Sequence, residues 1–182
     1  MINDINIWLE RLTSLYNSQV RHAANTEGIR PVHAEILQYL SICNRYSNTA
    51  QALSEYLGQT KGSISQSVQL LEKDGLIERR QCSEDKRVTR LFLTPKAQAI
   101  AERIGKVLMP NLGEAKEANN ALKSLLMDWQ LTNQHKGFGQ CQTCRYNSLL
   151  SDGTFQCGLT GESLSSDEVK LLCREHEFQV RS

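Results

Sequence analysis

The chain has 182 residues, of which 23% are charged, and its formal net charge is +1 at pH 7. This length suits one ordinary domain and a small second unit. Neither a bilayer-spanning apolar run nor the apolar core of a signal peptide is present in the sequence. We therefore expect a cytoplasmic protein that is not embedded in a membrane.

Basic charge is concentrated in one part of the chain. Between residues 61 and 96, eight Lys and Arg stand against five Asp and Glu, whereas from residue 136 onward five stand against six. DNA binding requires a local basic patch, and the net charge of the whole chain need not be positive. Segment 61–96 is therefore the candidate for contact with nucleic acid, with a marked dependence on salt.

Helices are predicted at the start of the chain. Residues 2–24 form a long first helix with one apolar side, which could pack in the domain core or against a partner. Pro31 suits the first turn of a second helix that runs to about Tyr46, and His33 is expected on its surface. The side chains expected on the apolar faces of these two helices are Ile5, Trp8, Leu9, Leu12, Leu15, Tyr16, Val20, Ile36, Leu37, Leu40 and Ile42.

Two further helices follow at short spacing. Asn48 or Thr49 is a suitable N-cap for a helix that ends at Gly58. Thr60 is a suitable N-cap for the next helix, which we expect to end at Gly75 in a left-handed conformation. Its apolar residues recur with the spacing of one helical face, at Ile64, Val68 and Leu71.

Two short strands are predicted after this helix. Residues 76–80 are predicted to form one short strand and residues 88–93 its partner, and a charged loop with Lys86 and Arg87 at its tip joins them. The order helix, glycine, strand, basic loop, strand is that of a winged helix.

The segment LGQTKGSISQSVQLLEKDGLIERR resembles the multiple-antibiotic-resistance regulator (MarR) family. The loop Asp85-Lys86-Arg87 and the following Leu93-Thr94-Pro95-Lys96 are the most specific parts of this resemblance. It extends from about residue 5 to about residue 131. It implies a mainly α fold with a small β-wing (α+β), a winged helix-turn-helix whose N- and C-terminal helices form a dimer interface.

The resemblance implies a double-stranded DNA partner and a homodimer. Hydroxyl, ammonium and amide groups at the start of the helix would hold phosphate, at Thr60, Lys61 and Ser63. The candidates for base edges are Ser65, Gln66 and Gln69. Gln66 stands where this family often has arginine, so the preferred bases cannot be carried over.

The wing supplies the remaining DNA-binding candidates. Arg87 resembles the family arginine that enters the minor groove, and Asp85 is expected to steady it. Further phosphate contacts are expected from Arg79, Arg80, Lys86 and Arg90. Two subunits would address a pseudo-palindromic operator with half-sites about one turn apart.

Two more helices are expected before the chain changes in character. One passes through Ala97, Ile100, Ile104 and Leu108 until Pro110 interrupts it. The other covers residues 111–131, with Leu112, Ala115, Leu122, Leu125, Leu126 and Trp129 as its apolar positions, and the resemblance makes both of them dimerisation helices. The polar stretch 132–137 then separates a domain of residues 1–132 from a segment of residues 133–182.

The last segment is rich in cysteine. Cys141 and Cys144 form a C-x2-C pair, with Cys157 and Cys173 further on and His176 three residues beyond. We expect a hairpin around Asp152-Gly153. We also expect a capping box, Ser165 with Glu168, that opens a helix carrying Cys173 and His176.

These cysteines indicate a metal site. In a cytoplasmic chain, clustered cysteines suggest metal or redox chemistry before disulfides, and so short a segment buries too little apolar surface to fold without a staple. The predicted ligands are Cys141, Cys144, Cys157 and Cys173, with His176 as the alternative to Cys173. Zinc suits a closed four-thiolate site, and an iron–sulfur cluster is the alternative cofactor. Cys43 is expected to be a buried apolar residue, and Cys82 an exposed wing residue that could have a redox role.

The sequence therefore predicts a transcription regulator, a repressor by resemblance, and not an enzyme. No nucleophile with a base and an orienting group is recognisable. Control could come from a small-molecule effector or from the metal segment, which would act as an oxidant, iron or nitric-oxide sensor if it held a cluster. A third alternative is that the segment recruits another protein.

Overall fold

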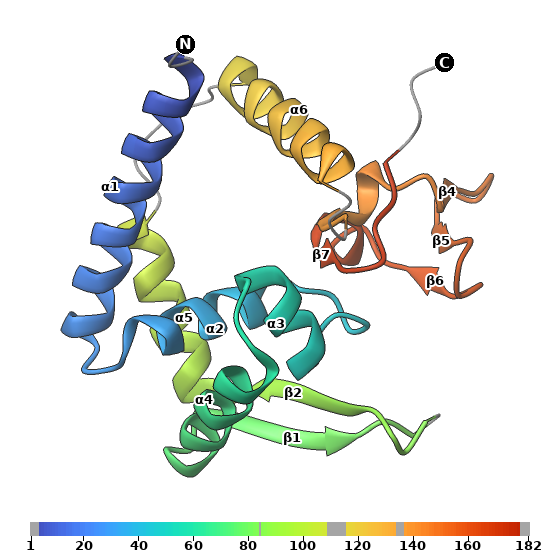
Figure 1. Ribbon diagram of the computed structural model, residues 1–182. Helices are drawn as coiled ribbons and strands as arrows, with labels where there is room; N and C mark the ends of the chain where they lie inside the picture. Colours follow the sequence, from blue (N-terminus) through green and yellow to red (C-terminus); the bar gives the residue numbers. More distant parts are fainter. Residues whose placement is uncertain (1–3, 84, 109–115, 134–136, 179–182) are drawn as a thin grey trace. The chain divides into compact units, whose positions relative to one another are not determined.

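The computed structural model describes residues 4–83, 85–108, 116–133 and 137–178 (Figure 1). Contacts between α-carbons divide the chain into two compact units. Met1–Ser41 and Thr60–Leu112 form one, here called the wing unit, and Ile42–Gln59 and Gly113–Ser182 form the other, here called the cysteine unit. Segment Ile42–Gln59 thus groups with the C-terminal part of the chain, whereas the sequence suggested one boundary after residue 132.

Three helices build the support of the wing unit: α1 (Asp4–Thr26), α2 (Pro31–Ile42) and α5 (Pro95–Leu108). Helices α1 and α5 lie side by side, and an ion pair of 2.7 Å joins Arg103 to Glu27. Gln38 of α2 donates a hydrogen bond of 2.5 Å to the carbonyl of Ala101 in α5. These contacts connect all three helices through polar groups at the margin of the apolar core.

The helix α4 (Lys61–Lys73) and a two-stranded sheet complete the wing unit (Figure 1). The hydroxyl of Thr60 accepts a hydrogen bond from the backbone N–H of Ser63, and Gly75 has φ of 67°, so both predicted ends of this helix are confirmed. Strands β1 (Ile77–Gln81) and β2 (Thr89–Leu93) pair antiparallel, with Ile77 opposite Leu93 and Gln81 opposite Thr89. The strands begin one residue later than the sequence predicted.

The predicted apolar faces are partly confirmed. Ile64, Val68 and Leu71 are buried, as are Ile36 and Leu37. The prediction for Ile42 was wrong, because that side chain is exposed. His33, expected on the surface, is also an error: its side chain is only 5% exposed, since the residue lies on the buried face of α2. Most of the apolar side of α1 is exposed, and within this stripe the buried residue is Val20.

The second helix ends earlier than predicted. It stops at Ile42 rather than near Tyr46. The backbone N–H of Asn44 instead donates to the carbonyl of Leu172 at 2.9 Å, and Cys43 forms a parallel bridge with Leu172. The Asn44 side chain accepts from the backbone of Tyr46 and from the hydroxyl of Ser47. These alternative hydrogen bonds replace the ones that a longer helix would make.

Within its described residues the cysteine unit contains the α-helices α3 (Ala50–Leu57) and α6 (Lys116–Thr132). Thr49 caps α3 by accepting from the N–H of Ala52, and Gly58 ends it with φ of 62°, as predicted. The positions at residues 109–115, including Pro110, Leu112 and Ala115, lie outside the described residues. Over its described length α6 exposes Leu122, Leu126 and Trp129.

Short strands and turns make up the rest of the cysteine unit. The predicted hairpin is confirmed: β4 (Asn147–Leu149) pairs with β5 (Phe155–Cys157), and Gly153 at its turn has φ of 83°. Strand β6 (Ser163–Leu164) pairs with the other edge of β5. Strands β3 (Gly139–Gln140) and β7 (Leu172–Cys173) form a second small sheet, and the single-turn helices are η1 (Cys141–Thr143) and η2 (Glu168–Lys170).

The capping box forms, but the helix predicted after it does not. Ser165 Oγ accepts from the N–H of Glu168 at 3.1 Å, and the Glu168 carboxylate accepts from the N–H of Ser165 at 2.9 Å. The helix nevertheless ends at Lys170. Cys173 lies in β7, opposite Gly139, and His176 follows in irregular structure, because pairing with β3 provides an extended backbone with hydrogen-bond partners.

The apolar core of the cysteine unit is small. Its buried cluster consists of Cys141, Leu164 and Val169, with Tyr46, Phe155 and Cys157 packed against it.

Of the helices in the described ranges, none has the length and apolar character to cross a membrane.

Candidate functional site

The first candidate site is the polar face of α4. Ser65, Gln66 and Gln69 are exposed, and Thr60 and Lys61 at the start of the helix are exposed as well. Ile64, Val68 and Leu71 on the opposite side are buried, which fixes the rotation of the helix about its axis. The helix therefore presents short hydrogen-bonding side chains to solvent, of the kind that contact base edges and phosphates.

The loop between β1 and β2, in the same unit as this helix, presents Arg87. Its side chain is 92% exposed. Asp85 Oδ1 accepts hydrogen bonds from the backbone N–H of Arg87 at 3.0 Å and from its Nε at 3.1 Å. The side-chain bond, and then the backbone bond, lower the pKa of the Asp85 carboxyl. The contact predicted between these two residues is thus present, and it restrains an otherwise free guanidinium.

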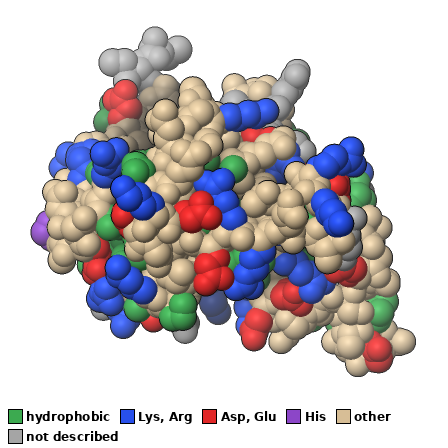
Figure 2. Space-filling view, turned by 90° about the horizontal axis from the view of Figure 1, so that it is seen from below, with side chains coloured by type: hydrophobic (Ala, Val, Ile, Leu, Met, Phe, Trp, Pro, Cys, Tyr) green, Lys and Arg blue, Asp and Glu red, His purple; other side chains and the backbone are tan. Residues whose placement is uncertain are grey.

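The other arginines of the strands have partners within the wing unit. Arg79 forms an ion pair of 2.9 Å with Glu72 of α4. Arg80 pairs with Glu78 at 2.7 Å, and its guanidinium lies 4.5 Å from the centre of the Phe92 ring. Arg90 is half-buried, whereas Lys86 is exposed. On the face of the molecule shown in Figure 2, Lys and Arg side chains are likewise interspersed with Asp and Glu.

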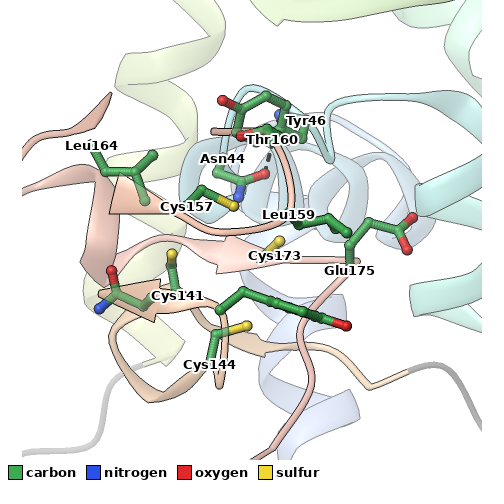
Figure 3. Close-up of a pocket in the computed structure, with 12 residues that line it drawn as sticks. Asn44, Tyr46, Cys141, Cys144, Cys157, Leu159, Thr160, Leu164, Cys173 and Glu175 are labelled. Carbon is green, nitrogen blue, oxygen red and sulfur yellow. Dashed lines mark hydrogen bonds between the residues drawn. The ribbon is translucent and has the colours of Figure 1, made fainter. Parts of the chain in front are cut away.

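The second candidate site is a cavity of approximately 170 Å³ in the cysteine unit. All four predicted ligands line it and lie around one space (Figure 3): Cys141, Cys144, Cys157 and Cys173. Cys141 and Cys144 lie at the two ends of η1, where the N–H of Cys144 donates to the carbonyl of Cys141 at 2.9 Å. Cys157 ends β5 and Cys173 ends β7, so the two small sheets bring the later cysteines to the turn.

Burial disfavours charge on the thiols of Cys141 and Cys173. Burial, together with the neighbouring Cys173, Cys144 and Cys157, raises the pKa of Cys141 to about 11. Burial also raises the pKa of Cys173, although hydrogen bonds from the Asn44 side chain and the Glu175 backbone act in the opposite direction. Four thiolates in this space would need a compensating cation.

The types of residue at this cavity suit a metal, but their arrangement does not form a site for a single metal ion. The donor set is suitable, since four cysteines face one cavity in a segment with a small core. Within the ranges that the structure describes, however, no group of three or more His, Cys, Asp and Glu is arranged so that it could hold a metal ion. The thiols thus share a cavity without being gathered at a point.

His176 does not line the cysteine cavity. Its side chain is buried, its Nε2 lies 2.9 Å from the hydroxyl of Thr143, and its ring packs against Phe178. Burial lowers its pKa. Gly139 leaves room for this ring, because a Cβ on that glycine would lie 2.8 Å from it. The structure therefore places Cys173, rather than His176, at the cavity.

The remaining two cysteines lie elsewhere. Cys43 is partly buried, and burial raises the pKa of its thiol to about 12. Cys82, expected to be exposed, is only partly so, and its backbone N–H donates to the carbonyl of Val88 at 2.9 Å.

Sequence reasoning missed how the segment after α2 joins the cysteine unit. Arg174 donates from Nε to Glu55 of α3 at 2.5 Å and from Nη2 at 2.9 Å. Its backbone N–H donates to Ser47 at 2.9 Å. Arg45 forms ion pairs with Glu162 at 2.7 Å and with Glu168 at 3.0 Å. A polar run after an apolar helix, residues 44–48, was the signal available, but it does not indicate its partner.

Comparison with known proteins supports the reading of the wing unit. Residues 27–88 match the sequence model of the MarR family. The structure is similar to NadR in complex with 4-hydroxyphenylacetate, with 26% identity and a TM-score of 0.54, covering 71% of this chain and 91% of that one. The matched part of the chain thus has the sequence pattern and the fold of MarR-type winged helices, a mainly helical fold with a small β-wing.

Two further solved structures share this fold. CouR from Rhodococcus jostii RHA1, bound to p-coumaroyl-CoA, has 18% identity and a TM-score of 0.57, over 70% of this chain and 92% of that chain. The MepR–DNA complex of S. aureus has 19% identity and a TM-score of 0.51, over 70% and 96%. Each is covered almost completely, whereas part of this chain has no counterpart in it.

Proposed function

We propose that this protein is a MarR-family transcription regulator that binds double-stranded DNA as a homodimer and represses its target genes. The observation that carries the proposal is the pairing of an exposed polar helix face with a restrained arginine. Ser65, Gln66 and Gln69 face solvent on α4, and Arg87 is held by Asp85 on the loop of the same unit.

The chemistry of this surface suits two grooves of DNA. A helix of 13 residues is about 20 Å long, which is enough to place its first turns in a major groove. Gln66 and Gln69 would read base edges, while Thr60, Lys61 and Ser63 would hold phosphate at the helix start. Arg87 would enter the adjacent minor groove. Arg79, Arg80, Lys86 and Arg90 would add phosphate contacts, and Arg79 and Arg80 would first have to leave their carboxylate partners.

Exposed apolar side chains support the dimer. On α1 the side chains of Ile5, Trp8, Leu12 and Tyr16 are exposed, and on α6 those of Leu122 and Trp129. Apolar stripes of this extent on isolated helices favour burial against another helix. In the proposed dimer these helices meet those of a second subunit, and two reading helices then address a pseudo-palindromic operator.

We propose further that Cys141, Cys144, Cys157 and Cys173 hold a metal centre that controls DNA binding. Support comes from contacts within the cysteine unit that join the strand carrying Cys173 to segment 42–59, which contains α3: Arg174 with Glu55, Arg174 with Ser47, and Leu172 with Asn44. Helix α3 is covalently joined to α4 by residues 58–60. In helix-turn-helix motifs the first helix sets the approach of the reading helix to DNA. A change at Cys173 would therefore act on the position of α3 and on operator fit.

A small-molecule effector is the second candidate for the control signal. Two structural relatives contain one: CouR binds p-coumaroyl-CoA and NadR binds 4-hydroxyphenylacetate. Removal of residues from Lys136 onward tests the role of the cysteine segment. If the shortened protein no longer folds, the segment is a structural staple; if it folds but no longer responds to metal or oxidant, the segment is a sensor. If it still responds to a small-molecule ligand but loses a protein partner, the segment recruits that partner.

The proposal is tested by mobility-shift titration of the full chain on its operator, with the operator first selected from random DNA. Arg87→Ala is expected to weaken binding several-fold and to lower the slope of log K against log salt by about 1. Lys106→Ala removes one exposed positive charge from α5 and serves as the control, with little expected effect.

A variant of the reading helix tests base recognition separately. Gln66→Ala should change which operator bases are preferred, at a cost of about 1–3 kcal/mol for the wild-type sequence. Unchanged affinity and an unchanged salt slope in Arg87→Ala would show that the wing does not contact DNA through Arg87. A failure of the wild-type protein to select any DNA sequence would overturn the regulator proposal.

A further inference from the structure

We infer that the four-cysteine cavity holds an iron–sulfur cluster rather than a single zinc ion. This inference rests on the proposed metal centre at Cys141, Cys144, Cys157 and Cys173, and it specifies the cofactor. It follows from the size of the cavity that the four cysteines line together with eight other residues, and from the groups that line it.

A single zinc ion would leave little space between its ligands. With Zn–S bonds of about 2.3 Å, a tetrahedral site places four sulfurs about 3.8 Å apart, and the ion fills the gap among them. The cavity that the four cysteines line measures approximately 170 Å³. One water molecule occupies about 10–15 Å³ on this measure, so the cavity has room for a group of many atoms.

An iron–sulfur cluster matches this arrangement. Its irons are bridged by sulfide ions, and each iron binds thiolate on the outside of the cluster, so four cysteines surround a volume instead of a point. The cysteines approach the cavity from three separate places: the turn at η1, the end of β5 and the end of β7 (Figure 3). No described histidine lines this cavity, and four thiolates satisfy the cluster.

The second layer of the cavity also suits a cluster. Its wall contains the apolar or aromatic side chains of Tyr46, Tyr146, Leu159 and Leu164. Asn44 and the backbone N–H of Glu175 form hydrogen bonds with Cys173. Hydrogen bonds to ligand sulfurs and a shielded surrounding are features that set the potential of a cluster.

The loop after Cys157 is held in place around the cavity by backbone hydrogen bonds. The N–H of Gly158 donates to the carbonyl of Tyr146 at 2.7 Å, and the N–H of Gly161 donates to the backbone carbonyl of Cys157 at 2.7 Å. A Cβ at residue 158 would lie 3.3 Å from the Tyr146 carbonyl oxygen, so glycine allows this close approach. Backbone hydrogen bonds of the cysteine unit therefore hold this part of the cavity wall in position.

The test is elemental and spectroscopic analysis of the full-length protein purified without oxygen. We expect about two or four iron ions per chain, an equal amount of acid-labile sulfide, and visible absorbance. If the protein emerges without metal, the same preparation is treated with ferrous iron and sulfide, and separately with zinc. Incorporation of iron and sulfide together supports the inference.

Cysteine variants locate the cluster. Cys157→Ser and Cys173→Ser should each lose most of the iron, sulfide and visible absorbance, whereas Cys82→Ser, in the wing unit, should keep them. The analysis of the unaltered chain stands even if a variant fails to fold. About one zinc ion per chain without sulfide, or no iron–sulfide uptake on reconstitution, would overturn the cluster.

The two proposals fail in different ways. Zinc at the four cysteines would remove the cluster and leave both the metal centre and the DNA-binding regulator in place. Selection of an operator by mobility shift tests the regulator proposal, whereas iron, sulfide and zinc analysis tests the cofactor, so the two outcomes are separate.

Discussion

At the scale of single residues, His33 shows how burial on a helix face changes a side chain's chemistry. The imidazole is buried in α2, and its Nε2 has no hydrogen-bond partner among the described residues. Burial lowers the pKa of His33, and Arg30 lowers it further, while Asp74 acts in the opposite direction. The folded protein therefore favours the neutral imidazole, whereas the unfolded chain titrates near the ordinary value of 6.5.

This shift predicts acid sensitivity. Above the unfolded-state pKa of about 6.5, both states carry neutral His33 and stability does not depend on it. As the pH falls below that value, protons bind preferentially to the unfolded chain, and the free energy of unfolding decreases until the folded-state pKa is passed. His33→Gln should reduce the loss of stability between pH 7.5 and 5.5, as measured by urea unfolding.

An exposed histidine of the neighbouring helix provides the control for this experiment. His22→Gln on α1 should leave the pH dependence of the wild type unchanged. An identical pH dependence in wild type and His33→Gln would show that His33 is not neutralised by burial.

At the scale of elements, the attachment of β7 to the segment before α3 is the feature with the most consequence. Arg174 follows Cys173 directly, and its guanidinium forms two hydrogen bonds with the Glu55 carboxylate. The two side chains are 19% and 27% exposed, so solvent screens the pair less than a surface ion pair. A ligand of the proposed metal centre is therefore one residue away from an ion pair with α3.

A double-mutant cycle measures this coupling. Arg174→Ala, Glu55→Ala and the double variant should give an interaction free energy of about 1–2 kcal/mol in chemical unfolding. The Arg145–Glu177 pair is the control, because both its side chains are about half exposed and should couple by less than about 1 kcal/mol. Equal coupling in the two cycles would mean that Arg174 contributes no more than a surface ion pair.

At the scale of the whole molecule, the exposed apolar faces of α1 and α6 are the surfaces that the proposed dimer would bury. Trp8 of α1 is 66% exposed and Trp129 of α6 is 52% exposed. Association of two chains through these helices would bury several such side chains, each contributing about 1.5–3 kcal/mol. The contacts that hold the two chains together would then also present two copies of α4 to the operator.

Charge at the proposed interface should separate the subunits. Trp8→Glu is expected to shift the protein from dimer to monomer in sedimentation experiments at micromolar concentration, and to weaken operator binding with it. Leu149→Glu changes a side chain that is similarly exposed, 67%, on the β4–β5 hairpin and serves as the control. A dimer that persists in Trp8→Glu, or a wild-type protein that is monomeric, would contradict the proposed interface.

The sequence alone predicted those features that depend on local pattern. Thr60 and Gly75 delimit α4, Ile64, Val68 and Leu71 fix its buried face, and Asp152-Gly153 marks a hairpin, because capping, periodicity and turn chemistry act between near neighbours in the chain. The same holds for the contact between Asp85 and Arg87.

Only the tertiary structure decided where long-range partners override local preference. The end of α2 at Ile42 and the extended conformation of Cys173 both arise because Asn44 and Gly139 pair with residues far along the chain. No local pattern encodes these pairings, since each strand gains its hydrogen bonds from the other. The spacing of the cysteines predicted a metal site. The cavity that they line, on which the inferred cluster rests, depends on how two small sheets meet around a turn.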